Sequence, residues 1–186
     1  MQKIILIDVD DVTLPLGPQW LAAYNRDWND NIQFEDISDW NWMNFIKPEC
    51  GRDIYKYLED GQLYENIQPI PGAAAGVIQF REWGFRPVFV TSMSPEYGNV
   101  GSLAPKYDAL VRLGFIESAD DYVACRDKTL VRGEILIDDR YDNYLASPYR
   151  SILKTQPWNK KYKVERRADT WIEIIELANE MIPRWL

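Results

Sequence analysis

The first strand-like segment of the chain ends in a group of carboxylates. In the stretch IILIDVDDVT, Asp8, Asp10 and Asp11 follow an aliphatic run within four positions. Like charges at such close spacing repel one another, so the arrangement is favourable only beside a positive group such as a metal ion or a lysine. The rest of the sequence must therefore supply a cation site or cationic side chains at the same place.

Polar residues also end two later aliphatic segments. Thr91 and Ser92 end RPVFVTS, and Asp138 and Asp139 end EILIDD. Because ligands of open parallel sheets bind outside the carboxyl ends of the strands, these side chains are expected at one sheet edge. Two lysines in connecting segments can reach that edge. The predicted site contains, in chain order, Asp8, Asp10, Thr91, Ser92, Lys106, Lys128, Asp138 and Asp139.

Clustered oxygen ligands with a few lysines are typical of a hard-cation site, and Mg²⁺ open to substrate oxygens is the predicted ion. The alternative is a solvated acidic rim, or aspartates that cap helices or turns. For any single aspartate that alternative is favoured. For the combined pattern, with hydroxyls and lysines between the acids, the metal site is favoured.

The chain of 186 residues contains no histidine. Its absence excludes Ser-His-Asp and Cys-His catalysis and every histidine-ligated metal centre. Acid–base work near neutral pH must then come from carboxylates, lysine or tyrosine. Cys50 and Cys125 form one pair at most, which is typical of a reducing compartment.

Alternating strands and helices organise most of the chain. The ranges 71–84, 104–114 and 168–182 are predicted helices, and such alternation indicates an α/β fold with a parallel sheet covered by helices on both sides. The predicted strands are residues 3–8, 86–92, 121–125, 134–139 and 150–155.

Residues 16–68 break this alternation. The segment has no aliphatic strand run, is rich in aromatic residues, and contains predicted helices at 19–28 and 48–59. An insertion directly after the first strand is expected to form a lid over the carboxyl edge of the sheet.

Composition limits the partners. The net charge of −8 argues against nucleic acid as an electrostatic partner. No apolar stretch approaches the ~20 residues of a membrane-spanning helix, and acids interrupt the N-terminal apolar run too early for a signal peptide. We therefore expect a cytoplasmic protein with no membrane partner, and leave a homodimer open.

The motifs resemble a known superfamily. Residues 8–12 (DVDDV) resemble the DxDx(T/V) signature of the haloacid dehalogenase (HAD) superfamily, and Thr91, Lys106 and Asp138-Asp139 match its second, third and fourth motifs. The stretches PIPGA, VTS, KYDALVRLG, CRDKTLVRGEILIDDR and QPWN are similar to the 5'(3')-deoxyribonucleotidases, the C-type 5'-nucleotidases. The resemblance implies a Rossmann-like HAD core at 1–15 and 69–186, with a small helical cap at 16–68.

The family resemblance also implies a reaction. Asp8 would attack phosphorus to form an aspartyl-phosphate, and Asp10 would protonate the leaving oxygen and then activate water. An acid at the second position favours phosphate esters over alkyl halides, because halide leaves without a proton. The implied activity is a Mg²⁺-dependent phosphatase of (deoxy)nucleoside monophosphates.

The remaining implied roles concern binding. Mg²⁺ would be held by Asp8, the backbone carbonyl of Asp10 and Asp139, with Asp138 in support. Phosphoryl oxygens would be bound by Thr91 and Ser92, with Lys106 balancing charge, and Lys128 and Arg140 would contact substrate or phosphate. In the cap, the residues expected nearest the base pocket are Trp40, Trp42, Met43 and Tyr57, although each of these could instead belong to the cap's own core.

Three positions depart from the family pattern. Asp11 replaces a glycine, Leu16 replaces an aromatic residue, and the loop after Ser92 is longer and begins with Met93 instead of proline. They leave the motifs intact but bear on substrate choice. The alternatives are another small phosphate ester, a terminal phosphate on nucleic acid, and a non-catalytic domain that binds nucleotides or a protein.

Overall fold

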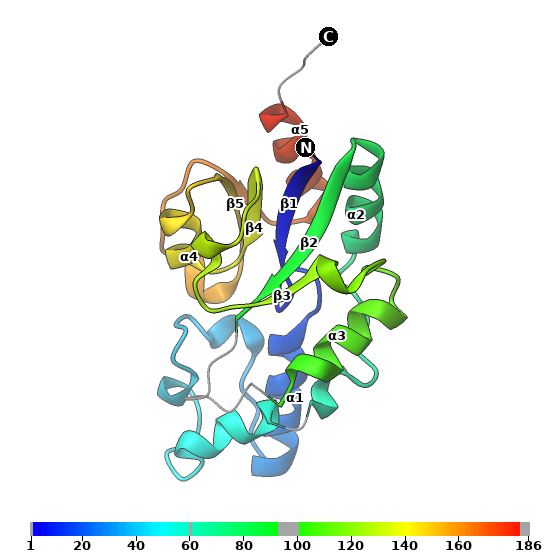
Figure 1. Cartoon of the computed structure of the whole chain (residues 1–186). Helices are drawn as coiled ribbons and strands as arrows, with labels where there is room; N and C mark the ends of the chain where they lie inside the picture. Colours follow the sequence, from blue (N-terminus) through cyan, green and yellow to red (C-terminus); the bar gives the residue numbers. More distant parts are fainter. Residues whose placement is uncertain (1, 60, 93–100, 183–186) are drawn as a thin grey trace.

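A six-stranded, all-parallel sheet forms the centre of the molecule (Figure 1). The computed structural model describes residues 2–59, 61–92 and 101–182. The strands lie in the order β3-β2-β1-β4-β5-β6. Their bounds are β1 Lys3–Asp8, β2 Phe85–Thr91, β3 Tyr122–Ala124, β4 Ile135–Asp138, β5 Arg150–Lys154 and β6 Arg167–Ala168.

Strand β1 is central because its aliphatic residues can be buried on both sides. Ile5 and Ile7 point into the larger core, while Leu6 joins a smaller cluster on the opposite face. All three are fully buried. A continuous aliphatic run is what a strand covered on both faces requires.

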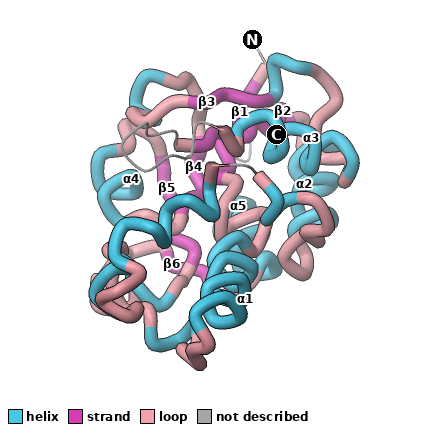
Figure 2. Tube along the Cα trace, turned by 90° about the horizontal axis from the view of Figure 1, so that it is seen from below, coloured by secondary structure: helices cyan, strands magenta, loops and turns pink. Residues whose placement is uncertain are grey.

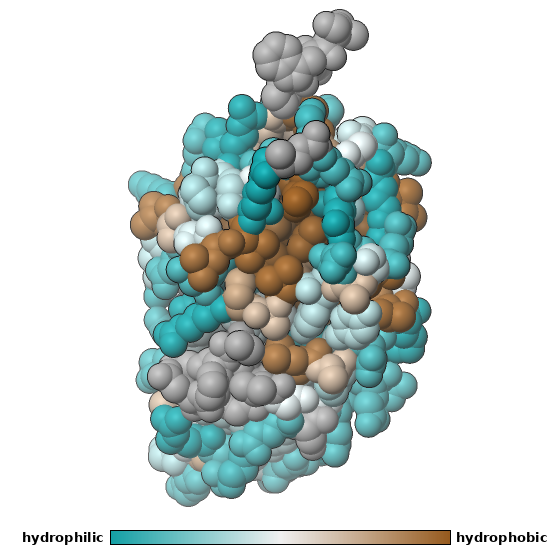
Figure 3. Space-filling model, in the orientation of Figure 1, coloured by the Kyte–Doolittle hydropathy of each residue, from teal (hydrophilic) through white to brown (hydrophobic). Residues whose placement is uncertain are grey.

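The two faces are covered unequally. Helices α2 (Ala73–Glu82) and α5 (Trp171–Met181) pack against each other on the larger core. Their approach requires Gly76, where a Cβ atom would lie 2.4 Å from Trp171. The other face is packed against the short helix α4 (Tyr141–Ala146), and Figure 3 shows apolar side chains gathered over the middle of the sheet. The expected helices on both sides are present, but the second layer is thin.

Residues 16–68 lie beyond one end of the sheet (Figures 1 and 2). They contain helix α1 (Leu16–Trp28) and 3-10 helices η1 to η4, and α3 (Leu103–Arg112) lies beside η4. The bounds of the short helices are η1 Phe34–Asp36, η2 Trp42–Asn44, η3 Gly51–Leu58, η4 Gln62–Tyr64, η6 Ala119–Asp121, η7 Lys128–Leu130 and η8 Pro157–Asn159.

Some predicted elements were wrong in detail. The helix expected at 48–59 is the 3-10 helix η3, because Gly51 has a positive φ of 47° and the turns close with i→i+3 hydrogen bonds. Helix α1 begins at Leu16, three residues before the expected start. Strand β6 was missed because its two residues carry no aliphatic run. The unusual loop after Ser92 lies at 93–100, outside the described residues.

Candidate active site

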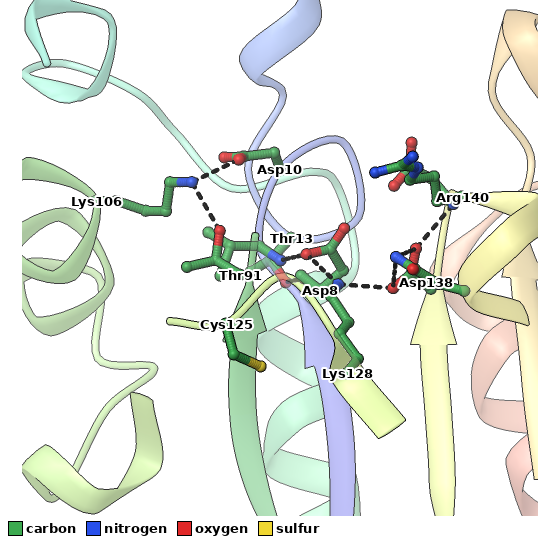
Figure 4. Close-up of polar contacts among 12 residues, drawn as sticks. Asp8, Asp10, Thr13, Thr91, Lys106, Cys125, Lys128, Asp138 and Arg140 are labelled. Carbon is green, nitrogen blue, oxygen red and sulfur yellow. Dashed lines mark hydrogen bonds and ion pairs between the residues drawn. The ribbon is translucent and has the colours of Figure 1, made fainter. Parts of the chain in front are cut away.

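The carboxyl ends of three adjacent strands bring the predicted residues together (Figure 4). Asp8 ends β1, Thr91 ends β2 and Asp138 ends β4. Because the strands are parallel and β1 lies between the other two, these side chains emerge at one edge. Thr91 and Asp138 follow Asp8 by 83 and 130 positions in the chain, and the parallel sheet brings them together.

Three of the carboxylates form a compact group. Asp8, Asp138 and Asp139 each offer an oxygen atom, and these atoms lie within 4.8 Å of one another. All three side chains are buried. Lys128, also buried, donates to the group through its Nζ atom, which is 2.7 Å from Asp8 Oδ1 and 2.6 Å from Asp138 Oδ2.

The three acids are not equivalent. Asp138 has its hydrogen bonds filled, because Oδ1 accepts from the Arg140 backbone N–H at 2.8 Å and both oxygens accept from Asn143 Nδ2 at 3.1 Å. Asp139 accepts from Trp158 Nε1 at 2.8 Å, and within the described residues it makes no ion pair. Negative charge is therefore in excess beside Asp8 and Asp139.

The pKa values of these side chains reflect the same excess of negative charge. Burial raises the pKa of Asp8 to about 6, although Lys128 opposes this. Burial and the neighbouring Asp8 raise the pKa of Asp139 well above its usual value. The pKa of Lys128 lies above its ordinary value because Asp138 and Asp8 outweigh the effect of burial, so its amine stays charged. A hard cation placed among these oxygens would stabilise the ionised carboxylates. The donor set fits Mg²⁺.

A second group lies beside the first and is built around Asp10. Lys106 donates to Asp10 Oδ2 at 2.6 Å and to Thr91 Oγ1 at 2.7 Å. Figure 4 shows that the Asp10 side chain points toward Lys106. The other oxygen, Oδ1, accepts from the Tyr64 hydroxyl at 2.7 Å. Both carboxylate oxygens of Asp10 therefore have a fixed donor.

Sequence reasoning missed Tyr64. It lies in η4, is 2% exposed, and belongs to none of the recognised motifs. Burial and Asp10 raise its pKa well above the usual value, so the phenol remains a hydrogen-bond donor. The only signal in the sequence was an aromatic residue that also carries a polar group, just before the stretch PIPGA.

Asp11 joins the end of β1 to helix α1. It has a φ of 57°, a left-handed conformation that glycine adopts freely and aspartate tolerates. Its Oδ1 accepts from the Gly17 backbone N–H at 2.8 Å, at the start of α1, where Pro15 offers no side-chain cap. Burial raises the pKa of Asp11 to about 8, while the bond from Gly17 opposes this rise. The glycine expected here is replaced by a residue that caps a helix.

A cavity of about 340 Å³ opens between these groups and residues 16–58. Trp40, Trp42 and Met43 line it, as do Ser92 and Arg140. The further lining residues are Asp8, Asp10, Asp11, Leu16, Trp20, Asn41, Arg52, Tyr55, Leu58, Asp139, Asn143 and Trp158.

The tryptophans of the cavity differ in what they can bind. Trp42 is 4% exposed and stacks on Trp20, with ring centroids 4.1 Å apart, so the two rings cover each other. Trp40 is 48% exposed. The Arg140 guanidinium lies 5.1 Å from its ring centroid, and Trp158 contacts it edge-on. Trp40 offers the most accessible aromatic surface, whereas Trp42 belongs to the buried hydrophobic core.

The structure places Tyr57 elsewhere. It lines a separate cavity of about 840 Å³ between α1, η3 and η4, and its hydroxyl donates to Asp27 Oδ2 at 2.9 Å. It does not line the cavity that contains Asp8. Tyr57 therefore lies apart from Trp40, Trp42 and Met43, because η3 turns its side chain toward α1, and its role in a base pocket stays a prediction.

Known proteins resemble this chain over most of its length. The profile of the family "5' nucleotidase, deoxy (Pyrimidine), cytosolic type C protein" matches residues 2–183. The 5'(3')-deoxyribonucleotidase of Clostridium acetobutylicum is 26% identical over 180 residues, which cover 94% of each chain.

Solved structures show the same fold. A predicted phosphatase from Clostridium acetobutylicum superposes with a TM-score of 0.63 at 13% identity, covering 97% of this chain and 99% of that one. A putative HAD-hydrolase from Bacillus subtilis bound to magnesium has a TM-score of 0.54 at 13% identity, covering 96% and 99%. The fold is that of HAD hydrolases, and the family match extends over nearly the whole chain. The chain belongs to the cytosolic type C family of deoxy (pyrimidine) 5' nucleotidases.

Proposed function

We propose that the protein is a Mg²⁺-dependent phosphatase that hydrolyses deoxynucleoside monophosphates to nucleoside and phosphate. One observation carries the proposal: the buried Asp8 faces two further carboxylates and Lys128, while Asp10 is held by a separate lysine beside the same cavity. Such a pair of differently supported acids is what a covalent phosphatase mechanism needs. The family and the names of its relatives supply the substrate class.

The metal would be held by Asp8, Asp139 and the backbone carbonyl of Asp10, with Asp138 in support. Asp138 suits a supporting role because Lys128, Arg140 and Asn143 already occupy its oxygens. When bound, the ion would neutralise charge on the phosphoryl oxygens.

Asp8 would attack phosphorus through its carboxylate, and the P–O bond to the sugar would break. Asp10 would give its proton to the departing oxygen, and would later take a proton from the water that cleaves the aspartyl-phosphate. Lys128 favours the ionised form of Asp8 against the effect of burial. Thr91 and Ser92 would donate to phosphoryl oxygens, and Lys106 would balance their charge.

Residues 16–68 would act as a cap that encloses the nucleoside, joined to a core made of 1–15 and 69–186. Within the cap, Trp40 is the best platform for a base, since its ring is exposed at the cavity. Arg140 lies between this ring and the carboxylate group, where it could bind the phosphate or the sugar. Met43 would contact the same base, and Trp42 would support the cap from its core.

A substrate panel tests the function. Deoxynucleoside 5'- and 3'-monophosphates, ribonucleotides, sugar phosphates and a 5'-phosphorylated oligonucleotide are compared by phosphate release with Mg²⁺. The proposal expects the highest kcat/KM for deoxynucleoside monophosphates, and activity lost in EDTA and in Asp8→Asn. Equal rates on non-nucleotide esters would contradict the substrate class, and no release from any ester would favour a binding domain.

The cellular setting is also proposed. The described residues contain no helix long and apolar enough to cross a membrane. A cytoplasmic location agrees with the acidic composition and with two free cysteines. Light scattering on purified protein would test the homodimer that the sequence leaves open.

A further inference from the structure

We infer that Tyr64 is a positioning residue for Asp10, and that its hydroxyl fixes the carboxylate that serves the leaving oxygen. The inference rests on the proposed function, because it assigns Tyr64 a role in the acid–base work of Asp10. The hydroxyl lies 2.7 Å from Asp10 Oδ1, across 54 positions of the chain.

Tyr64 lies behind Asp10, away from the substrate. Its side chain is 2% exposed and does not line the cavity, whereas Asp10 does. The hydroxyl therefore acts only through Asp10. A phenol can donate to an ionised carboxylate and equally to the carbonyl oxygen of a carboxylic acid. It can thus hold Asp10 both before and after the proton moves.

The second donor to Asp10 is shared. Lys106 Nζ bonds to Asp10 Oδ2 and also to Thr91 Oγ1. A bound phosphoryl group would attract the same amine, because it adds negative charge beside Thr91. Tyr64 has no such competing acceptor among the described residues, so its bond is the one that persists when substrate binds.

The backbone around Tyr64 is held against the helix that carries Lys106. Arg112, at the end of α3, donates to the Tyr64 carbonyl oxygen at 3.2 Å. Gly61 packs so closely on Pro105 that a Cβ atom there would lie 2.3 Å from its ring. The Lys106 ammonium lies 5.6 Å from the centroid of the Tyr64 ring. The two donors to Asp10 therefore come from elements that are docked together, and the end of the cap segment contributes one of them.

Leaving-group dependence tests this role. kcat/KM is measured for Tyr64→Phe on a deoxynucleoside 5'-monophosphate, whose alkoxide needs a proton, and on 4-nitrophenyl phosphate, whose phenolate leaves without one. We expect about a tenfold loss on the nucleotide and less than a twofold loss on the nitrophenyl ester, since general acid catalysis contributes about 10²–10⁴-fold and only its positioning is impaired. In an Asp10→Asn background, Tyr64→Phe should cause no further loss.

Tyr24→Phe is the matched control. Tyr24 is also a buried tyrosine in residues 16–68, and its hydroxyl donates to a carboxylate at the same 2.7 Å, but to Asp30, which does not line the cavity. It should leave the ratio of the two kcat/KM values unchanged. Equal losses of Tyr64→Phe on both esters, no loss on either, or a further loss in Asp10→Asn would overturn the inference. Unimpaired phosphate release by Asp8→Asn would instead overturn the proposed function.

Discussion

Lys128 pairs with Asp8 and Asp138 at once, at 2.7 Å and 2.6 Å. It lies in η7, between β3 and β4, and its side chain is 2% exposed. One ammonium thus neutralises part of a group of three buried carboxylates. Asp139 has no such partner among the described residues, and a cation beside it would stabilise its ionised form.

Replacing Lys128 should destabilise the protein. Lys128→Met would leave two buried carboxylates without their partner, which typically costs about 3–5 kcal/mol of unfolding free energy. Urea unfolding in EDTA would measure the loss. Lys161→Gln is the control, since Lys161 forms a half-exposed pair with Asp39 at 3.0 Å and should change the free energy by less than about 1 kcal/mol. A stable Lys128→Met protein would contradict the charge balance described above.

Mg²⁺ should raise the melting temperature, because an ion that binds only the folded state stabilises it. Asp139→Asn should abolish most of the rise, since it removes one proposed ligand and one of the excess charges. Differential scanning fluorimetry across a Mg²⁺ titration would measure both. Asp53→Asn, an exposed carboxylate paired with Lys56, should retain the full rise. A full rise in Asp139→Asn would rule this residue out as a ligand.

Without metal, stability should fall as the pH rises from about 4 to about 8. Burial raises the pKa of Asp11 from 3.8 to about 8, so the folded state holds a proton that the unfolded state releases. The folded state binds more protons across this window, and its stability therefore declines with increasing pH. The stabilisation is fully present below pH 4 and is lost as pH passes through 8.

Asp11→Asn should flatten this decline. Asparagine tolerates the φ of 57° and keeps an oxygen that can accept from Gly17 N–H, but it does not titrate. Urea unfolding in EDTA at pH 5 and pH 8.5 would compare the two proteins. The variant should be the more stable one at pH 8.5, with a smaller difference at pH 5. A difference that does not depend on pH would show that Asp11 does not titrate in this range.

Trp40 and Trp42 should respond differently to truncation. Trp40→Ala removes an exposed ring that could stack on a base, worth about 1–3 kcal/mol, so KM should rise about tenfold with little change in kcat or stability. Trp42→Ala removes a buried ring stacked on Trp20 and should cost about 3–5 kcal/mol of unfolding free energy. Steady-state kinetics and urea unfolding together separate the two roles. An unchanged KM in Trp40→Ala would place the base elsewhere.

The sequence by itself determined the strands and their polar ends. The aliphatic run before Asp8 predicted a strand that is buried on both faces. The aliphatic segments that end at Thr91 and Asp138 predicted two more such strands, and the structure buries all three. Local hydrophobicity decides such strands, and parallel pairing then brings their carboxyl ends to one edge. The expected α/β fold with a parallel sheet was therefore confirmed, apart from the two-residue β6.

Only the tertiary structure decided which polar groups meet. The Tyr64 hydroxyl reaches Asp10 because η4 packs on α3, and Tyr57 turns away because η3 packs on α1. Neither outcome is encoded in a local pattern, since a buried tyrosine and a pocket tyrosine look alike in sequence. The short 3-10 helices η1 to η4 have no strong periodicity, so the direction of their side chains follows from packing between segments far apart in the chain.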